Sequence, residues 1–304
     1  MRLLVLLAAS SLRATTFYVT VSGLGGEQEY EQRFSGLATD LDKILKAAPD
    51  SRVDTLLGPG ATRQQVRAAL ERLAQQAKPQ DALVVMLIGH GTFDGADYKF
   101  NLPGPDMTAI ELAALLDRVP AARQLVVNTT SASGGSITAL RKEKRVVVCA
   151  TKAGTEKNAT VFARYWVEAL RESAADVDKN ETISALEAFR YAEQKTARYY
   201  ETQKRLATEH PVLEDTGKGE GVRAPGPENG EGLVAASFPL LRVGVAAAAS
   251  ADPARRKLLG RKEELEQEID RLKYQKAAMP LDEYRKQLAA LLLELAKTQA
   301  ELDK

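Results

Sequence analysis

The apolar segment Asp81–Ile88 (DALVVMLI) constrains the fold more than any other feature of the chain. A strand of this composition is covered on both faces, as the inner strands of parallel sheets are. Shorter strands are predicted at Thr16–Ser22, Arg52–Leu57, Gln124–Val127 and Arg145–Cys149, and helices at Glu29–Ala47, after Thr62, after Thr108 and at Val161–Arg171. Strands and helices that alternate at this spacing predict an α/β fold: a mostly parallel sheet with helices on both faces.

The carboxyl ends of the strands are where such a sheet places its ligand sites. His90 stands between two glycines directly after the buried strand, and Leu125–Gly135 runs from another buried strand into a loop of small residues that contains Ser131. The glycines leave a backbone N–H, that of Gly91, free to face an oxyanion. Histidine with a hydroxyl is the minimum set for nucleophilic acyl transfer. We expect His90 and Ser131 to face each other; the alternative is a structural histidine beside an inert serine.

The composition excludes several other kinds of site. Lys+Arg 42 against Asp+Glu 41 leaves a net charge of +1, so no overall field draws the chain to nucleic acid or to an anionic membrane. The single cysteine, Cys149, excludes an internal disulfide framework and multi-cysteine metal sites, and its apolar strand predicts a small buried hydrophobe. Two histidines make a histidine-rich metal centre implausible. His210, which precedes a long loop, is interpreted as structural or as a loop anchor.

Residues 16–200 resemble the caspase, legumain and gingipain superfamily of cysteine peptidases. The catalytic histidine of that superfamily follows an apolar strand as His-Gly, which matches His90 and Gly91. Its nucleophile lies in the pattern apolar-Asp/Glu-Ala-Cys-x-Ser-Gly. Aligning that Ser-Gly with Ser133 and the following glycine places Ser131 at the cysteine and Thr129 at the acidic residue. The resemblance therefore implies a caspase-like fold and a catalytic role for His90, Gly91 and Ser131.

A third stretch extends the resemblance to legumain in particular. The segment Val148–Gly154 is similar to legumain's Ala-Thr-x-Ala stretch, which forms part of the wall of the substrate pocket. The similarity implies substrate binding by Thr151, Ala153 and Glu156.

The departures from the family pattern favour an inactive protein. A hydroxyl is a far weaker acid than a thiol, whose free pKa is about 8.5, so Ser131 needs an adjacent and oriented base. Neither motif contains an acidic residue that clearly orients His90, although Asp94 and Asp97 are near it in the sequence. We expect a catalytically degenerate binding or scaffold module for a peptide or protein ligand. The alternative is an active peptidase that uses Ser131 with His90.

A separate segment matches the ligand order of a calcium-binding EF-hand loop. Oxygen-bearing side chains stand at positions 1, 3, 5, 7, 9 and 12 of the loop, namely Asp176, Asp178, Asn180, Thr182, Ser184 and Glu187. Glu181 replaces the glycine of position 6, so a bound calcium ion is expected to be held with modest affinity. The alternative is plain helix capping, because Ser184-x-x-Glu187 is also a capping box. No other cofactor is expected.

Two terminal segments flank the α/β domain, which we place at residues 15–245. A basic start and the apolar run Leu3–Ala9 predict a secretory signal peptide over residues 1–14, and hence a secreted or periplasmic location. No later stretch has the roughly 20 apolar residues that span a bilayer. At the other end, leucines at heptad spacing on both sides of Pro280 predict a coiled-coil-like helical hairpin over residues 252–304. The hairpin either packs on its own domain or forms an oligomer or binds a partner protein.

Overall fold

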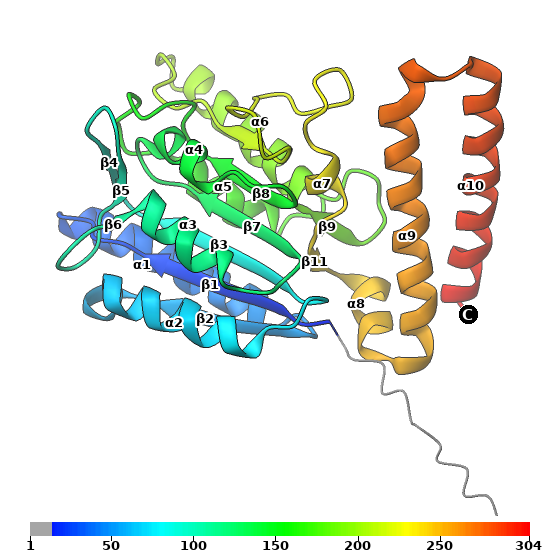
Figure 1. Ribbon diagram of the computed structural model, residues 1–304, viewed down its shortest axis with the longest axis horizontal. Coiled ribbons are helices and arrows are strands. Elements are labelled where there is room, and N and C mark those ends of the chain that lie inside the picture. Colours follow the sequence, from blue (N-terminus) through cyan, green and yellow to red (C-terminus); the bar gives the residue numbers. More distant parts are fainter. Residues whose placement is uncertain (1–13) are drawn as a thin grey trace, which may run out of the picture.

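The core of the molecule is a mostly parallel sheet. The structure is a computed structural model and describes residues 14–304. Within that range, six strands pair in the order β10-β8-β7-β3-β1-β2, and only β10 is antiparallel to its neighbour (Figure 1). The strands are β1 (Thr16–Ser22), β2 (Ser51–Leu56), β3 (Ala82–Ile88), β7 (Arg123–Asn128), β8 (Arg145–Cys149) and β10 (Val212–Glu214). The α/β sheet predicted from the sequence is confirmed.

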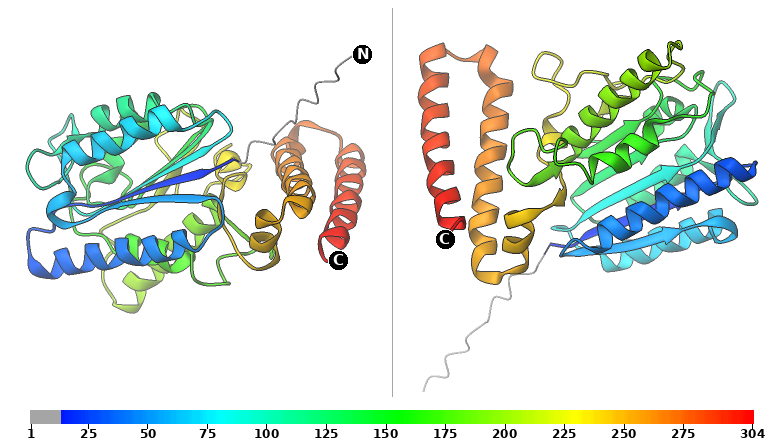
Figure 2. Two further views of the ribbon diagram at one scale, coloured as in Figure 1. Left: turned by 90° about the horizontal axis from the view of Figure 1, so that it is seen from below. Right: turned by 180° about the vertical axis from the view of Figure 1, so that it is seen from behind.

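Helices cover both faces of the sheet (Figure 2). One face carries α1 (Gln28–Lys46), α5 (Phe162–Ala169) and α6 (Ala185–Thr202); the other carries α2 (Arg63–Gln76), α3 (Ala109–Asp117) and α4 (Ile137–Leu140). Successive side chains of β3 enter opposite cores: Val84 and Met86 lie in the first, and Leu83 and Val85 in the second. Because both faces are buried, the strand has no polar face, which explains the continuous apolar run.

Side-chain caps fix where three of the helices begin. Thr62 accepts a hydrogen bond from the N–H of Gln65 at the start of α2, and Thr108 accepts one from Glu111 at the start of α3. Ser184 and Glu187 form a reciprocal capping box at the start of α6. Each capped helix therefore begins where its sequence signal predicts.

Short strands absent from the sequence prediction surround the main sheet. Directly after His90, the strands β4 (Gly91–Phe93), β5 (Tyr98–Phe100) and β6 (Met107–Thr108) form a small antiparallel sheet. The apolar pattern of residues 232–243 predicts one further strand, but these residues form a short helix, α7 (Leu233–Ala236), followed by β11 (Pro239–Arg242). β11 pairs antiparallel with β9 (Thr182–Ser184), inside the EF-hand-like segment. Short 3-10 turns lie at Gly58–Gly60, Ser133–Ser136 and Lys276–Ala278.

The C-terminal residues form a helical hairpin, with α9 beside the α/β domain and α10 outside (Figures 1 and 2). A short helix, α8 (Gly244–Ala251), leads into α9 (Pro253–Gln275), and α10 (Leu281–Leu302) follows the turn at Pro280. Leu265, Ile269 and Leu272 of α9 are buried, as their heptad spacing predicts. At the start of α10, the spacing of four residues between Asp282 and Lys286 predicts an exposed ion pair between them. The structure pairs Asp282 with Arg285 instead, at 3.9 Å.

No helix among residues 14–304 is long and apolar enough to cross a membrane. The predicted signal peptide, apart from its last residue, lies outside the described residues.

Candidate functional site

The carboxyl ends of β3 and β7 bring the two predicted site residues to one edge of the sheet. The strands are neighbours, with Leu87 opposite Asn128 in the register. His90 follows β3 by two residues and Ser131 follows β7 by three. Parallel pairing thus places both loops at the same edge.

The Ser131 hydroxyl is bonded to the backbone of Gly91. Its Oγ accepts a hydrogen bond from the Gly91 N–H and donates one to the Gly91 carbonyl, both at 3.1 Å. The side chain is buried, with 3% of its surface exposed. Among the described residues, no hydrogen bond joins Ser131 to His90. The hydroxyl therefore has its donor and its acceptor engaged by the residue next to the histidine, not by the imidazole.

The imidazole of His90 is packed between aromatic rings of α1. The rings of Tyr30 and Phe34 meet it edge-on, with centroids 4.8 and 5.1 Å away. Burial lowers the pKa of His90, and the Arg33 guanidinium lowers it further, against a backbone hydrogen bond with Gly25 and two glutamates. Burial and the guanidinium therefore both favour the neutral imidazole. Asp94, which lies near it in sequence, accepts instead from Ala96 and Asp97 in its own turn.

Polar residues before Ser131 satisfy one another inside the fold. The Thr129 hydroxyl donates to the Leu87 carbonyl at 2.7 Å, so the residue at the family's acidic position bonds to β3. The Tyr98 hydroxyl lies 2.6 Å from that of Thr130, which in turn donates to the Asn128 side chain at 2.8 Å. All these groups are buried. They fix the loop, and none of them presents a carboxylate to His90.

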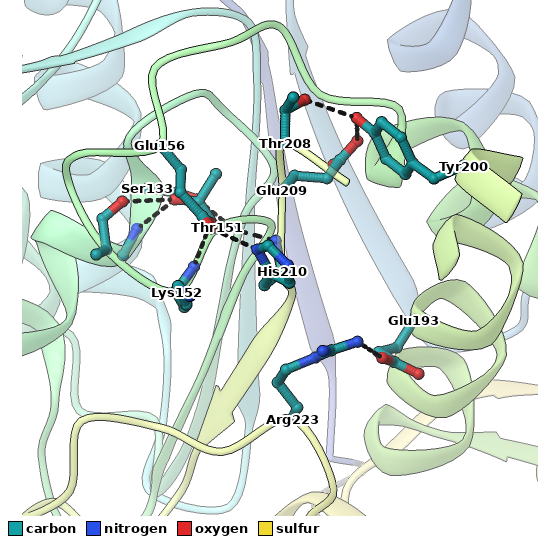
Figure 3. A network of polar contacts seen from close by, with 12 residues as sticks. Ser133, Thr151, Lys152, Glu156, Glu193, Tyr200, Thr208, Glu209, His210 and Arg223 are labelled. Atoms are coloured by element: carbon teal, nitrogen blue, oxygen red, sulfur yellow. Dashed lines mark hydrogen bonds and ion pairs between the residues drawn. The ribbon is translucent and has the colours of Figure 1, made fainter. Parts of the chain in front are cut away.

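The predicted substrate-binding residues pack against the Ser131 loop (Figure 3). The Thr151 hydroxyl contacts the Ser133 hydroxyl at 3.1 Å and accepts from the Gly134 N–H at 2.9 Å. A Cβ on that glycine would lie 2.3 Å from the Ala153 nitrogen. Glu156 accepts the Ala132 N–H through its carbonyl, at 2.7 Å. The backbone of the segment from Thr151 to Glu156 therefore contacts the backbone of the Ser131 loop directly. The Thr151 hydroxyl is hydrogen-bonded inside this contact.

A carboxylate does orient an imidazole in this region, but the imidazole is that of His210. The Nδ1 of His210 lies 2.5 Å from the Glu156 carboxylate, which also accepts the N–H groups of His210 and Lys152 (Figure 3). The neighbouring Glu209 accepts from the first N–H groups of α5 and from Tyr200. Burial raises the pKa of Glu209 to about 7. No local pattern predicts the contact between Glu156 and His210, because the two residues are 54 positions apart.

Cys149 does not replace the missing thiol. Its side chain is fully buried at the end of β8, where the Sγ donates to the Ser133 carbonyl at 3.3 Å. Burial raises its pKa to about 12, so the sulfur stays protonated. The thiol therefore packs as a small hydrophobe, which was the expectation.

The EF-hand-like segment brings three of its six predicted ligands together. Asp176, Asp178 and Glu187 each offer a carboxylate oxygen, and these oxygens lie within 4.8 Å of one another. Desolvation and the Glu187 carboxylate raise the pKa of Asp178 to about 6. Asn180 and Ser184 form hydrogen bonds within the segment: the Asn180 Oδ1 accepts the Thr182 N–H, and the Ser184 Oγ donates to the Glu187 carboxylate.

Helix α9 and the start of α8 close over this segment. Glu181 has φ 63°, the left-handed conformation for which EF-hand loops use glycine, and its carboxylate accepts the Ala246 N–H at the start of α8. From α9, Lys262 donates to the Asn180 carbonyl at 3.0 Å. The Asn180 amide donates to Glu266 at 3.2 Å. The segment is therefore joined to the helical hairpin.

The comparisons with known proteins give a likeness in structure and none in sequence. No family model matches the chain, and no curated protein matches it. Caspase-1 from Spodoptera frugiperda is 12% identical, with a TM-score of 0.49, over 67% of this chain and 87% of that one. A protein from Geobacter sulfurreducens is 13% identical, with a TM-score of 0.44, over 67% and 93%. The Drosophila initiator caspase Dronc is 11% identical, with a TM-score of 0.45, over 67% and 80%.

Proposed function

We propose that this chain is a caspase- or legumain-like domain without peptidase activity, which acts as a binding or scaffold module. The contact between Ser131 and Gly91 carries the proposal. One pair of hydrogen bonds occupies both the hydroxyl at the nucleophile position and the N–H that would face an oxyanion. Acyl transfer needs the first group bonded to a base and the second free for the developing charge.

The surroundings of His90 support the same proposal. A serine nucleophile needs an imidazole held by a third group, usually a carboxylate. His90 is held by aromatic edges and a peptide group, whereas the carboxylate-bound imidazole belongs to His210. The sequence departures at Ser131 and Thr129 agree with this arrangement.

Peptide-library cleavage by the purified protein and three variants tests the proposal. We expect no turnover by the parent above that of His90→Ala. Ser131→Cys introduces the cysteine nucleophile of the peptidase superfamily that this chain resembles. Ser133→Cys is the control, because it places the thiol two residues away. Gain of cleavage by Ser131→Cys alone would place the degenerate nucleophile at that position. Turnover by the parent that His90→Ala abolishes would establish a serine peptidase and overturn the proposal.

We also propose that the segment Asp176–Glu187 binds calcium. Three carboxylates that share a space within 4.8 Å repel one another, and the Glu187 carboxylate adds to desolvation in raising the pKa of Asp178. A hard divalent cation with oxygen ligands relieves it. Glu181 already adopts the left-handed conformation of the loop, stabilised by the contact of its side chain with α8.

Two further parts of the proposal concern the ends of the chain. The predicted signal peptide assigns the protein to the periplasm or the exterior, and N-terminal sequencing of protein recovered from those fractions tests this. The helical hairpin is proposed as the surface through which the domain associates with another protein chain.

A further inference from the structure

Helix α10 carries two apolar stripes, and only one has a partner. The first stripe faces α9: Thr298 and Leu302 are buried, and Leu288, Leu291 and Leu295 are half-buried. The second stripe consists of Ala289, Leu293, Ala296 and Ala300, all exposed, with Leu293 60% exposed. At 100° per residue, the second stripe lies well over a quarter-turn from the first. It therefore faces away from α9, and α10 is itself the outer helix of the hairpin (Figure 2).

The second stripe has the spacing of a coiled-coil seam. Its members are separated by four, three and four residues, which is the heptad alternation. Three of them are alanine, and small side chains let two helices approach closely. A plain solvated helix face has no need of this pattern.

We propose that the second stripe of α10 binds the same stripe of a second copy of this chain, antiparallel across a twofold axis. This inference rests on the proposed role of the helical hairpin as an association surface and names its partner. The spacing reads the same in both directions, so reversal places Ala289 opposite Ala300 and Leu293 opposite Ala296. Each leucine thus meets an alanine of the other copy, and large against small side chains fill such a seam. A twofold interface requires this kind of self-complementarity.

Charges at the ends of the stripe support the same register. Extending the heptad by one position in each direction reaches Lys286 at one end and Asp303 at the other. In the antiparallel pair, Lys286 of each copy lies opposite Asp303 of the other, so two opposite-charge pairs flank the apolar centre. Parallel pairing would instead place like charges together, Lys286 with Lys286 and Asp303 with Asp303. Antiparallel pairing of two copies is therefore the arrangement that both the packing and the charges favour.

Dimerisation adds the second copy's helical hairpin to this one. Two hairpins joined through α10 make a four-helix layer, with α9, and behind it the α/β domain, on each outer side. Both strand-end sites and both Asp176–Glu187 segments stay with the α/β domains, away from the seam. The association therefore presents two binding domains from one assembly.

Sedimentation equilibrium of the full chain over a range of concentrations tests the proposal. We expect a monomer–dimer equilibrium in the parent and a dissociation constant at least about tenfold higher in Leu293→Glu. Ile110→Glu is the matched control, because Ile110 on α3 is 62% exposed and far from the hairpin; its dimerisation should equal that of the parent. Circular dichroism checks that each variant is folded.

Charge reversal tests the register. Lys286→Asp and Asp303→Lys alone should each weaken the dimer by about threefold, and the double variant should restore it. A parent that is monomeric at every concentration, or a dimer that Leu293→Glu leaves unchanged, overturns the proposal. A dimer lost in Leu293→Glu but not rescued by the double reversal overturns the antiparallel register. Peptidase assays on the Leu293→Glu monomer keep the proposed lack of activity a separate question.

Discussion

The strand-end site and the Asp176–Glu187 segment hold their polar side chains in opposite ways. Around Ser131, hydroxyl and amide groups donate to and accept from one another, so the cluster is neutral and internally satisfied. In the segment, carboxylates only accept, and three of them point their oxygens at one space. The first arrangement has its donors and acceptors paired, whereas the second is the one for which we propose a bound calcium ion. The two clusters also differ in burial, because Ser131 and its partners are buried whereas Asp178 is exposed to solvent.

The largest expected effect comes from disturbing the satisfied cluster. A Cβ at Gly91 would lie 2.5 Å from the Tyr98 ring and 2.6 Å from the Ser131 carbonyl. We expect Gly91→Ala to lower the free energy of unfolding by about 3 kcal/mol or more, measured by urea denaturation. Gly36→Ala, in α1 with nothing within 4 Å of the new Cβ, is the control and should be neutral or slightly stabilising. Equal effects from both would show that the contact at Gly91 is loosely packed.

Calcium should stabilise the crowded carboxylates by a smaller amount. At about 100 times its dissociation constant, a ligand adds about 2.7 kcal/mol to the free energy of unfolding. We expect a calcium-dependent rise in melting temperature and a binding heat by calorimetry for the parent, both lost in Asp178→Asn. Asp176→Ala should also lose them. Asp282→Asn, which removes a fully exposed carboxylate on α10, is the control. Equal heats from parent and Asp176→Ala would leave only the capping role of Ser184 and Glu187.

Glu231, an acidic residue in the loop after β10, extends the comparison to the effect of pH on stability. Burial, together with the carboxylates of Glu214 and Asp215, raises the pKa of Glu231 to about 7, above its ordinary value near 4.5. Its contribution to stability is complete below about pH 4.5, falls as the pH rises, and is lost above about pH 7. Relative to Glu231→Gln, we expect the parent to lose about 2 kcal/mol of unfolding free energy as the pH rises from 4.5 to 8. Ser131→Ala should show no such dependence on pH.

The smallest effect is expected where a carboxylate is neither crowded nor buried. Asp282 pairs with Arg285 at 3.9 Å, and its side chain is fully exposed. Asp282→Ala should leave the free energy of unfolding unchanged within the error of urea denaturation, at low and at high salt. A larger change in unfolding free energy, measured at protein concentrations where the chain is monomeric, would mean that the stability of α10 depends on the Asp282–Arg285 pair.

Local patterns in the sequence were sufficient for the main helices and strands and for their order along the chain. The β3 run, the caps at Thr62 and Thr108 and the turn at Pro280 are each specified by a few neighbouring residues. The rules of parallel sheets then place His90 and Ser131 at one edge. These features depend on side-chain periodicity and on caps within one turn, which a linear reading captures.

Contacts between distant segments were beyond such a reading. The small sheet after His90, the pairing of β9 with β11 and the bond between Glu156 and His210 join segments whose approach depends on the whole fold. The prediction that Asp282 pairs with Lys286 was also wrong, because Arg285 and Lys286 both lie within reach of Asp282 on the helix surface.

The sequence by itself determined that this chain forms an α/β sheet with a helical hairpin and that a histidine and a serine meet at one sheet edge. Only the tertiary structure decided which groups hydrogen-bond to those two residues or pack against them. The Ser131 hydroxyl turns to the peptide of Gly91, and the carboxylate that holds an imidazole holds that of His210. The physical reason is that strands and helices follow from local periodicity, whereas the partner of a buried polar group is whichever donor or acceptor the packed fold brings within 3 Å.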